Sequence, residues 1–553
     1  IDGIDTQTII DEVDEDIHLL IPTHHQKGIH ETLQVENDND DDFGTKRYVE
    51  NYESDDLTDS STLENSVSLK EITQIQSLSF GDIGSVSHID HLLSVYPEHY
   101  QNLPTINVTP SSPQFQENKK EFAMDILGLD LKAPGTPYKE FVLAFSWAVY
   151  IFEQYLGVRQ YRKLREPNPP KSLQDIEEIR EKFHKTQEYG LDKAKFGFVS
   201  GLFGQVQSTW IIVWDVLPWL WNLSGEWLTY AGYGTDYEIT QSLIFTVTIT
   251  TMLYFISLPL SLYYTFVIEE RHGFNKMTLG LFVMDTVKGF LITGVIGLPI
   301  IALGLQIIKW SGDNFYFYVW VFMIIFNFIL LTIYPTLIQP LFNKVTPLPE
   351  GELREQIEAL AARIKFPLKK LHVIDGSKRS GHSNAYFYGF FKNKQIVIYD
   401  TLIEQANNEE ILAVVGHELG HWSLNHSVKV LTIYQIHNLF LFFVFSQFIS
   451  NTVLYRSFGF ETQPTLIGFI LFQFIYAPIE NVVAFLMNIL SRKHEFEADA
   501  FAKKLGYGKQ LRTGLIKIQI KNLGNINNDA WYSAYHFSHP PLPERLNALE
   551  KMD

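Results

Sequence analysis

Long apolar runs alternate with polar segments between residues 141 and 490 of the sequence. Seven runs come close to the roughly 20 residues that an apolar helix needs to cross a bilayer. They predict a mainly α-helical, polytopic membrane protein with seven transmembrane helices. Because the first run is short and polar residues interrupt the second, one of these two also fits a buried soluble helix. The predicted spans are Phe141–Leu156, Phe198–Leu220, Ser242–Phe266, Val287–Ile308, Phe315–Ile338, Val430–Leu454 and Pro464–Leu490.

The loops between the spans predict an orientation. Gly157–Lys195 carries ten Lys and Arg residues, whereas Trp221–Gln241 carries none. Basic loops stay on the cytoplasmic side of a membrane. Counting forward from the first loop, we expect the polar segments 341–429 and 491–553 to share the cytosol.

The polar and apolar segments divide the chain into five predicted parts. The two polar parts are expected to form one soluble domain of helices and a small sheet, split by the last two spans. The parts are an acidic extension (1–122), spans one to five (123–340), the first soluble part (341–429), spans six and seven (430–490) and the second soluble part (491–553).

Sequence patterns predict several helices and strands in the first soluble part. Gly351–Ile364 has the pattern of an amphipathic helix, and Leu371–Ile374 that of a strand. Two further strands, Ala385–Phe391 and Gln395–Tyr399, are separated by a short polar turn, which predicts a hairpin. A helix is expected from about Asn408 to His426.

Charge is distributed very unevenly along the chain. Residues 1–120 hold 24 Asp and Glu but only 6 Lys and Arg, whereas the rest of the chain holds 39 and 38. The whole-chain net charge of −19 therefore belongs to the N-terminal extension and says nothing of an acidic enzyme surface. Such a polar segment cannot bury a core, so we expect the extension to be disordered.

The sequence contains no cysteine. Disulfides and thiolate chemistry are thereby excluded, and any metal ion must be held by His, Asp or Glu. No glycine-rich phosphate loop occurs either, and no nucleic-acid partner is expected.

The expected helix near residue 417 contains an H-E-x-x-H motif, formed by His417, Glu418 and His421. Four residues turn about 400° around a helix, so the two imidazoles face the same way and can meet one ion. Glu418 lies beside them and can polarise a zinc-bound water. The alternative is a pair of unrelated surface histidines.

A catalytic zinc ion needs a third protein ligand. His426 is the nearest histidine, but it lies about 180° around the helix from His417. It also misses the extended zinc-protease motif, because Leu424 and Ser427 stand where that motif has Gly and His. His426 is therefore expected to be solvated or to lie behind the ligands.

The downstream segment 491–500 offers a better third ligand. Glu495 and Asp499 are four residues apart and share one helical face, so Glu495 would bind the ion and Asp499 would hold a histidine ring by its second nitrogen. Glu497 is rotated about 200° from Glu495 and binds the ion only if the register differs. Without the H-E-x-x-H motif this segment would be taken as a solvated helix end.

Six short motifs follow one another in order over about three quarters of the chain. They are Phe266–Asn275, Gly376–Gly389, His417–Trp422, His494–Gly506, Ser538–Pro541 and Glu544–Leu546. With these motifs the chain from about residue 138 onward resembles the type I CAAX prenyl proteases, integral-membrane zinc metalloproteases of the endoplasmic reticulum and inner nuclear membrane.

The resemblance implies an architecture and a reaction. Seven transmembrane helices would enclose a water-filled chamber, closed on the cytosolic side by a gluzincin-like domain with one Zn²⁺. The enzyme would remove the last three residues from farnesylated or geranylgeranylated CAAX proteins, and some members make a second, upstream cut. Its partners would be prenylated C-termini and membrane lipids.

The resemblance also implies roles for individual residues. It assigns the zinc ligands and the general base to the residues already found from their spacing. It adds His539 and Arg545 as residues that stabilise the tetrahedral intermediate or position the substrate. Asn384 and Ala385 match the edge strand on which the substrate peptide lies.

Two other functions fit parts of this pattern. A quality-control intramembrane zinc protease would use the same chemistry on substrates without a prenyl group. A transporter or channel with a structural metal would instead need a closed site with four protein ligands. Glu418 favours an enzyme, because a structural site has no use for a carboxylate beside its ligands.

Overall fold

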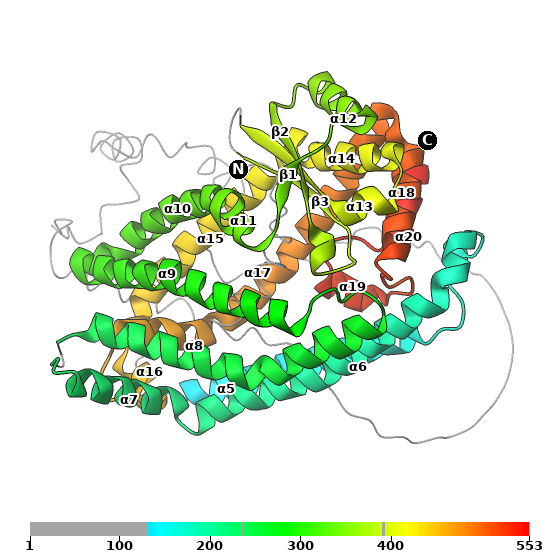
Figure 1. Ribbon diagram of the computed structural model, residues 1–553. Coiled ribbons are helices and arrows are strands. Elements are labelled where there is room, and N and C mark those ends of the chain that lie inside the picture. The colour runs from blue at the N-terminus through cyan, green and yellow to red at the C-terminus, as the bar shows by residue number, and fades with distance from the viewer. Residues whose placement is uncertain (1–130, 132, 235, 390–392, 552–553) are drawn as a thin grey trace, which may run out of the picture. The chain divides into compact units, whose positions relative to one another are not determined.

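The computed structural model describes residues 131, 133–234, 236–389 and 393–551 (Figure 1). The acidic extension 1–122 lies outside the described residues. All described residues belong to one compact unit.

Six continuous helical stretches in the described part of the chain have the length and composition of a membrane span. The fourth, Leu279–Phe342, contains two helices that pack against each other, α9 (Leu279–Ser311) and α10 (Phe315–Ile333). The seven predicted runs thus all lie mostly in helices, although seven is not an exact count of continuous stretches. The other five stretches are Tyr138–Leu164, Glu177–Val213, Glu238–Glu269, His426–Phe448 and Thr465–Lys521.

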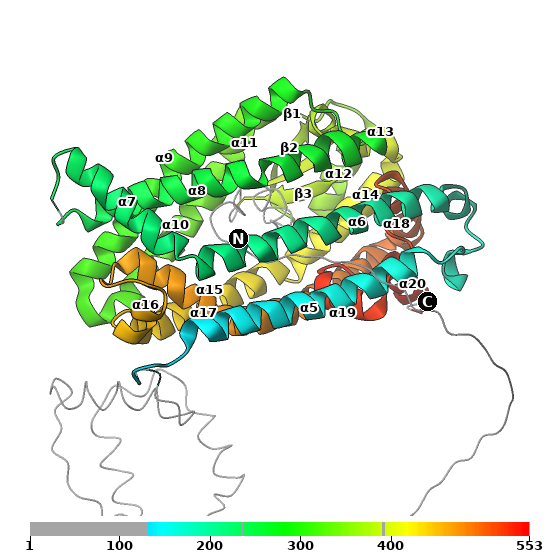
Figure 2. The ribbon, with the colours of Figure 1, turned by 90° about the horizontal axis from the view of Figure 1, so that it is seen from below.

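Few residues of the apolar helices are buried by other parts of the protein. In the most apolar window of Leu279–Phe342 only 6% of the residues are buried. Uncovered apolar surface on this scale is suited to lipid. Figure 2 shows these helices running alongside one another. The remaining elements of this region are α5 (Tyr138–Leu164), α6 (Glu177–Val213), α7 (Val216–Tyr230), α8 (Glu238–Tyr263), α11 (Gln339–Phe342), α15 (His426–Phe448) and α16 (Thr452–Ser457).

The predicted span Phe198–Leu220 is wrong in its last seven residues, which lie beyond the end of the helix. The helix α6 ends at Val213, and Asp215 adopts a left-handed conformation with φ 51° before α7 begins. The Asp215 carboxylate accepts a hydrogen bond from Lys139 Nζ at 2.7 Å. A polar residue in this conformation turns the chain, so α7 packs against α8 where the sequence suggested a loop.

The first soluble part contains a four-stranded sheet in the order β1-β2-β4-β3. The predicted hairpin is confirmed, because β3 (Ala385–Tyr388) pairs antiparallel with β4 (Lys394–Tyr399), although β3 is shorter than expected. The predicted amphipathic helix is α12 (Glu352–Arg363). The other elements are β1 (Val345–Pro347), β2 (Leu368–Ile374), α13 (Asp400–Gln405) and α14 (Asn408–Ser423).

One long helix, α17 (Thr465–Ala502), joins the membrane region to the soluble elements (Figure 1). Its first part is the last predicted span, and its end carries Glu495 and Asp499. It runs without interruption through residue 490, where we placed the boundary between two parts. One continuous helix therefore connects the membrane region to the candidate site. It contacts α14, α18 (Gly508–Lys521), α19 (Ala530–His536) and α20 (Leu542–Lys551).

Candidate metal centre

The helix α14 begins with a capping box. The side chain of Asn407 accepts a hydrogen bond from the Glu410 backbone, and the Glu410 carboxylate accepts one from the Asn407 backbone. Such a box satisfies two backbone donors that a helix start leaves unpaired. Ile411, Val415 and Leu419 bury one side of the helix in the core of the soluble domain. These contacts fix how α14 presents its histidines to α17.

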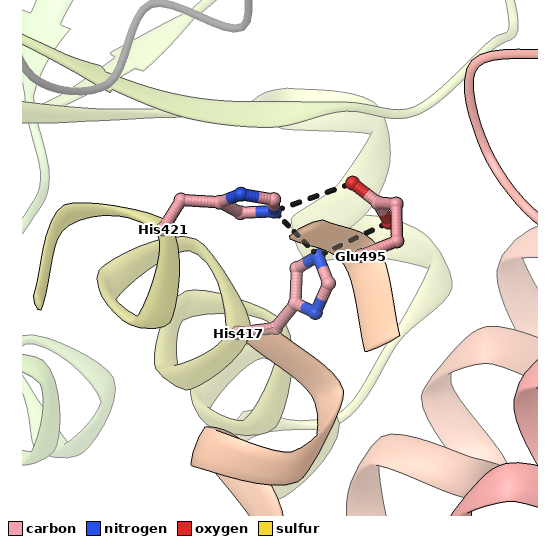
Figure 3. A group of neighbouring side chains, drawn as sticks. All are labelled: His417, His421 and Glu495. Carbon is pink, nitrogen blue, oxygen red and sulfur yellow. Dashed lines mark hydrogen bonds and ion pairs between the residues drawn. The ribbon is translucent and has the colours of Figure 1, made fainter. Parts of the chain in front are cut away.

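The side chains of His417, His421 and Glu495 converge on one point (Figure 3). The two Nε2 atoms lie 3.2 Å apart, and Glu495 oxygens lie 3.5 Å from His417 Nε2 and 3.2 Å from His421 Nε2. Ligands about 2.1 Å from a tetrahedral zinc ion lie roughly 3.4 Å from one another. Glu495 Oε2 is buried and has no hydrogen-bond partner among the described residues. The group therefore fits a zinc ion with one position left for water.

A buried carboxylate and a guanidinium lie behind these side chains. Asp499 is fully buried and lies 2.9 Å from His417 Nδ1, as the helical spacing predicts. Arg545 donates two hydrogen bonds to Asp499, at 2.9 and 2.7 Å, and its third nitrogen lies 3.3 Å from Glu495. The sequence predicts that Arg545 stabilises the tetrahedral intermediate or positions the substrate. In the structure its contacts orient two carboxylates of the metal group.

The electrostatics of the group favour charge on its members. Burial alone would lower the pKa of His417, but the carboxylates of Glu495 and Asp499 raise it to about 10. A metal ion must displace that proton, because only a neutral imidazole binds metal. Burial also opposes the charge of Arg545, yet Asp499 and Glu495 raise its pKa above the usual range.

Two further predicted residues lie around the group. Glu418 is half-buried on α14, next to His417 in sequence. His539 lies 3.4 Å from Glu495 through its Nε2 atom, and its side chain is 46% exposed. His539 thus borders the metal group on a side that solvent reaches.

The strand β3 forms one edge of the sheet and packs against α14. The Tyr399 backbone donates to Asn384 O, so alternate residues along the strand face β4. Ala385 and Phe387 therefore direct their backbone groups to the open edge. The Asn384 side chain accepts a hydrogen bond from the Ala385 backbone at 2.7 Å. The amide oxygen of Asn384 therefore pairs with the Ala385 N–H group, which an added strand would otherwise use as a hydrogen-bond donor.

Sequence reasoning missed how the loop before β3 is tied to the membrane helices. His382 lies 3.4 Å from Glu269, which also accepts a hydrogen bond from Tyr189 at 2.6 Å. Arg379 makes a two-pronged ion pair with Asp285 on α9, with N–O distances of 2.8 and 3.0 Å. Of these residues, all except Tyr189 and Asp285 lie in the motifs on which the resemblance rests. Membership of those motifs was the sequence feature that could have pointed to them. These contacts set where β3 lies relative to the end of the stretch Glu238–Glu269 and to α9.

Close contact between α14 and α17 at Gly420 brings Glu495 within reach of the histidines. A Cβ at Gly420 would lie 3.2 Å from the Ala498 backbone and from Phe501 Cβ. We expect Gly420→Ala to push α14 and α17 apart. Because Glu495 lies on α17, it would move away from the histidines, and metal binding should weaken severalfold. Metal affinity by chelator competition measures this effect.

Gly416→Ala is the matched control on the same helix. A Cβ at Gly416 would meet its nearest neighbour, Tyr507, at 3.6 Å, which is ordinary packing. This variant should bind metal like the wild type. Equal losses in both variants would show that helix separation at Gly420 does not govern the group.

The apolar helices and the two-histidine, one-carboxylate group together define a membrane metallopeptidase. The family model for the CAAX prenyl protease N-terminal region, with five membrane helices, matches residues 160–344, and that for peptidase family M48 matches residues 347–553. The chain belongs to the CAAX prenyl protease 1 family within M48 and is a metalloendopeptidase.

Individual relatives support this assignment. The chain is 50% identical to CAAX prenyl protease 1 homolog from Oryza sativa, over 75% of this chain and 98% of that protein. Identity to the Homo sapiens homolog is 47%, over 74% of this chain and 95% of that protein. The crystal structure of S. mikatae Ste24p superposes with a TM-score of 0.71 at 42% identity, covering 75% of this chain and all of that chain.

Proposed function

We propose that this chain removes the C-terminal three residues from prenylated CAAX proteins, using one Zn²⁺ held by His417, His421 and Glu495. The observation that carries the proposal is the convergence of these three side chains at tetrahedral spacing. Three protein ligands leave a position open for water, as catalytic zinc sites require. A structural site in a transporter would need a fourth protein ligand instead.

A bound zinc ion would supply Lewis-acid chemistry to the scissile carbonyl and the attacking water. Glu418 takes the proton of that water as it attacks, and later gives it to the leaving amine. His539 donates to the carbonyl oxygen as negative charge develops there. Arg545 and Asp499 keep the ligands oriented and are positioning residues.

The substrate peptide would add as a strand to the open edge of β3. The backbone groups of Ala385 and Phe387 face that edge, and β3 packs against the metal-bearing helix. Strand addition positions a peptide by main-chain hydrogen bonds, which suits a varied tail sequence. We infer that Asn384 releases the Ala385 donor when the peptide enters.

The prenyl group explains why the peptidase is joined to membrane helices. An isoprenoid chain is apolar and needs a cavity at membrane level. We propose that the helices enclose this cavity in the endoplasmic reticulum membrane, with the metal site facing the cytosol. The ten basic residues between the first two predicted spans support that orientation. A second, upstream cut in a precursor would use the same site.

Cleavage of matched peptides tests the substrate class. We expect the purified chain to release the last three residues from a farnesylated CAAX peptide at least tenfold faster than from the same peptide without farnesyl. The lipid adds binding energy of about 0.8 kcal/mol per buried CH₂. The Glu418→Ala variant controls for contaminating proteases. Equal rates on both peptides would favour the quality-control protease.

A further inference from the structure

A chain of hydrogen-bonding groups leads from His421 to the protein surface. His421 Nδ1 lies 3.0 Å from His426 Nδ1, and His426 Nε2 lies 2.9 Å from Glu497 Oε2. His426 is 2% exposed, whereas the Glu497 side chain is 37% exposed. Neither His426 nor Glu497 takes part in the catalytic group described above.

The protons along this chain can be assigned from the metal outward. His421 would hold a zinc ion through Nε2, so its single proton would lie on Nδ1 and be donated to His426 Nδ1. His426 therefore carries its own proton on Nε2 and donates it to the Glu497 carboxylate. Each step follows from a neutral imidazole having one donor and one acceptor nitrogen.

We propose that His426 and Glu497 are positioning residues that hold His421 in its metal-binding tautomer and orientation. The proposal rests on the proposed metal site. His417 receives the same support directly, from Asp499 at 2.9 Å. Ligand histidines generally pair their second nitrogen with a carboxylate or carbonyl. In this chain an additional imidazole connects His421 to its carboxylate.

Local structure explains how the additional imidazole comes to lie beside His421. His421 lies near the end of α14, and Asn425, with φ 57°, turns the chain into α15, whose first residue is His426. The turn brings His426 beside His421 and against α17. There its ring stacks on His494, with centroids 4.0 Å apart and planes 8° from parallel.

A second metal site is the competing interpretation of this cluster. Ligand atoms of His426, His494 and Glu497 all lie within 4.8 Å of one another. However, binding an ion through His426 Nε2 would move its proton to Nδ1, which faces His421 Nδ1. His421 would then need its own proton on Nε2 and would lose its place at the catalytic ion. Parallel stacked rings also direct their nitrogen lone pairs side by side rather than at one point.

Metal affinity of the full chain tests the proposal. We expect Glu497→Gln to weaken zinc binding about tenfold and His426→Leu up to about a hundredfold, the range found for supporting residues around metal ligands. His426→Gln should recover part of the loss, because its amide oxygen can accept from His421. Chelator competition gives the affinity, and metal analysis should find one ion per wild-type chain.

Two controls separate support from a second site. His494→Phe keeps a stacked ring but removes both nitrogens, and Lys493→Ala removes the cation 3.8 Å from Glu497. Both variants should bind one ion with unchanged affinity. Excess zinc should restore turnover of Glu497→Gln, since that variant keeps the catalytic groups.

Three results would overturn the proposal. One is wild-type affinity in both Glu497→Gln and His426→Leu, with correctly folded protein shown by unchanged thermal unfolding without metal. Another is a second bound ion that disappears in His494→Phe. If either result is found while the wild-type chain still binds its catalytic ion, the proposed function is unaffected. A wild-type chain that binds no ion would remove the proposed function and the inference together.

Discussion

Glu418→Gln should slow peptide cleavage by about 10²–10⁴-fold while leaving metal content unchanged. The substitution keeps the size of the side chain but removes the group that accepts the proton of the attacking water. General-base catalysis contributes about 10²–10⁴-fold to a rate, and we expect a loss in that range. Single-turnover cleavage of a prenylated peptide by metal-loaded protein measures it.

Metal analysis of the same preparation supplies the control for this result. Glu418 is not one of the three converging ligands, so Glu418→Gln should retain one ion per chain. Loss of the ion from this variant would show that Glu418 is itself a ligand. Activity within threefold of the wild type would show that another group acts as the base.

Asp499→Asn should destabilise the soluble domain by about 3–5 kcal/mol, the cost of removing one partner from a buried ion pair. Asp499 is fully buried and accepts two hydrogen bonds from Arg545, which is itself almost completely buried. The substitution takes away the carboxylate that pairs with the guanidinium through two hydrogen bonds, while Glu495 remains 3.3 Å away. Denaturant unfolding of the metal-free chain in detergent gives the difference in free energy.

A more exposed ion pair in the same region provides the comparison. Arg492 and Glu544 lie 2.7 Å apart, and the Glu544 side chain is 44% exposed. Exposed pairs contribute about 0–1 kcal/mol, so Glu544→Gln should have a much smaller effect. Similar losses of unfolding free energy in Asp499→Asn and Glu544→Gln would mean that burial does not make the Asp499–Arg545 pair more important for stability.

Hydrophobic patterning predicted the membrane helices well but not their breaks. Every predicted span lies mostly in helix, because a run of apolar residues is a strong local signal. The break at Asp215 depends on one left-handed residue and on a partner, Lys139, far away in sequence. The continuity of α17 through residue 490 was also hidden, because composition changes there while the helix does not.

The spacing of residues within helices carried most of the candidate site. The intervals from His417 to His421 and from Glu495 to Asp499 place each pair on one face, which needs no knowledge of the fold. The contact between the two helices at Gly420 and the support of His421 by Glu497 through His426 arise from tertiary packing. No local pattern encodes such contacts, so only the structure reveals them.

Zinc content of the wild type and of Glu495→Gln tests the central claim most directly. Three ligands from two helices should hold one zinc ion per wild-type chain. Glu495→Gln should lose that ion at chelator concentrations that the wild type withstands, because a neutral amide is a poor zinc ligand. A Glu495→Gln chain that keeps its zinc with wild-type affinity would contradict the account.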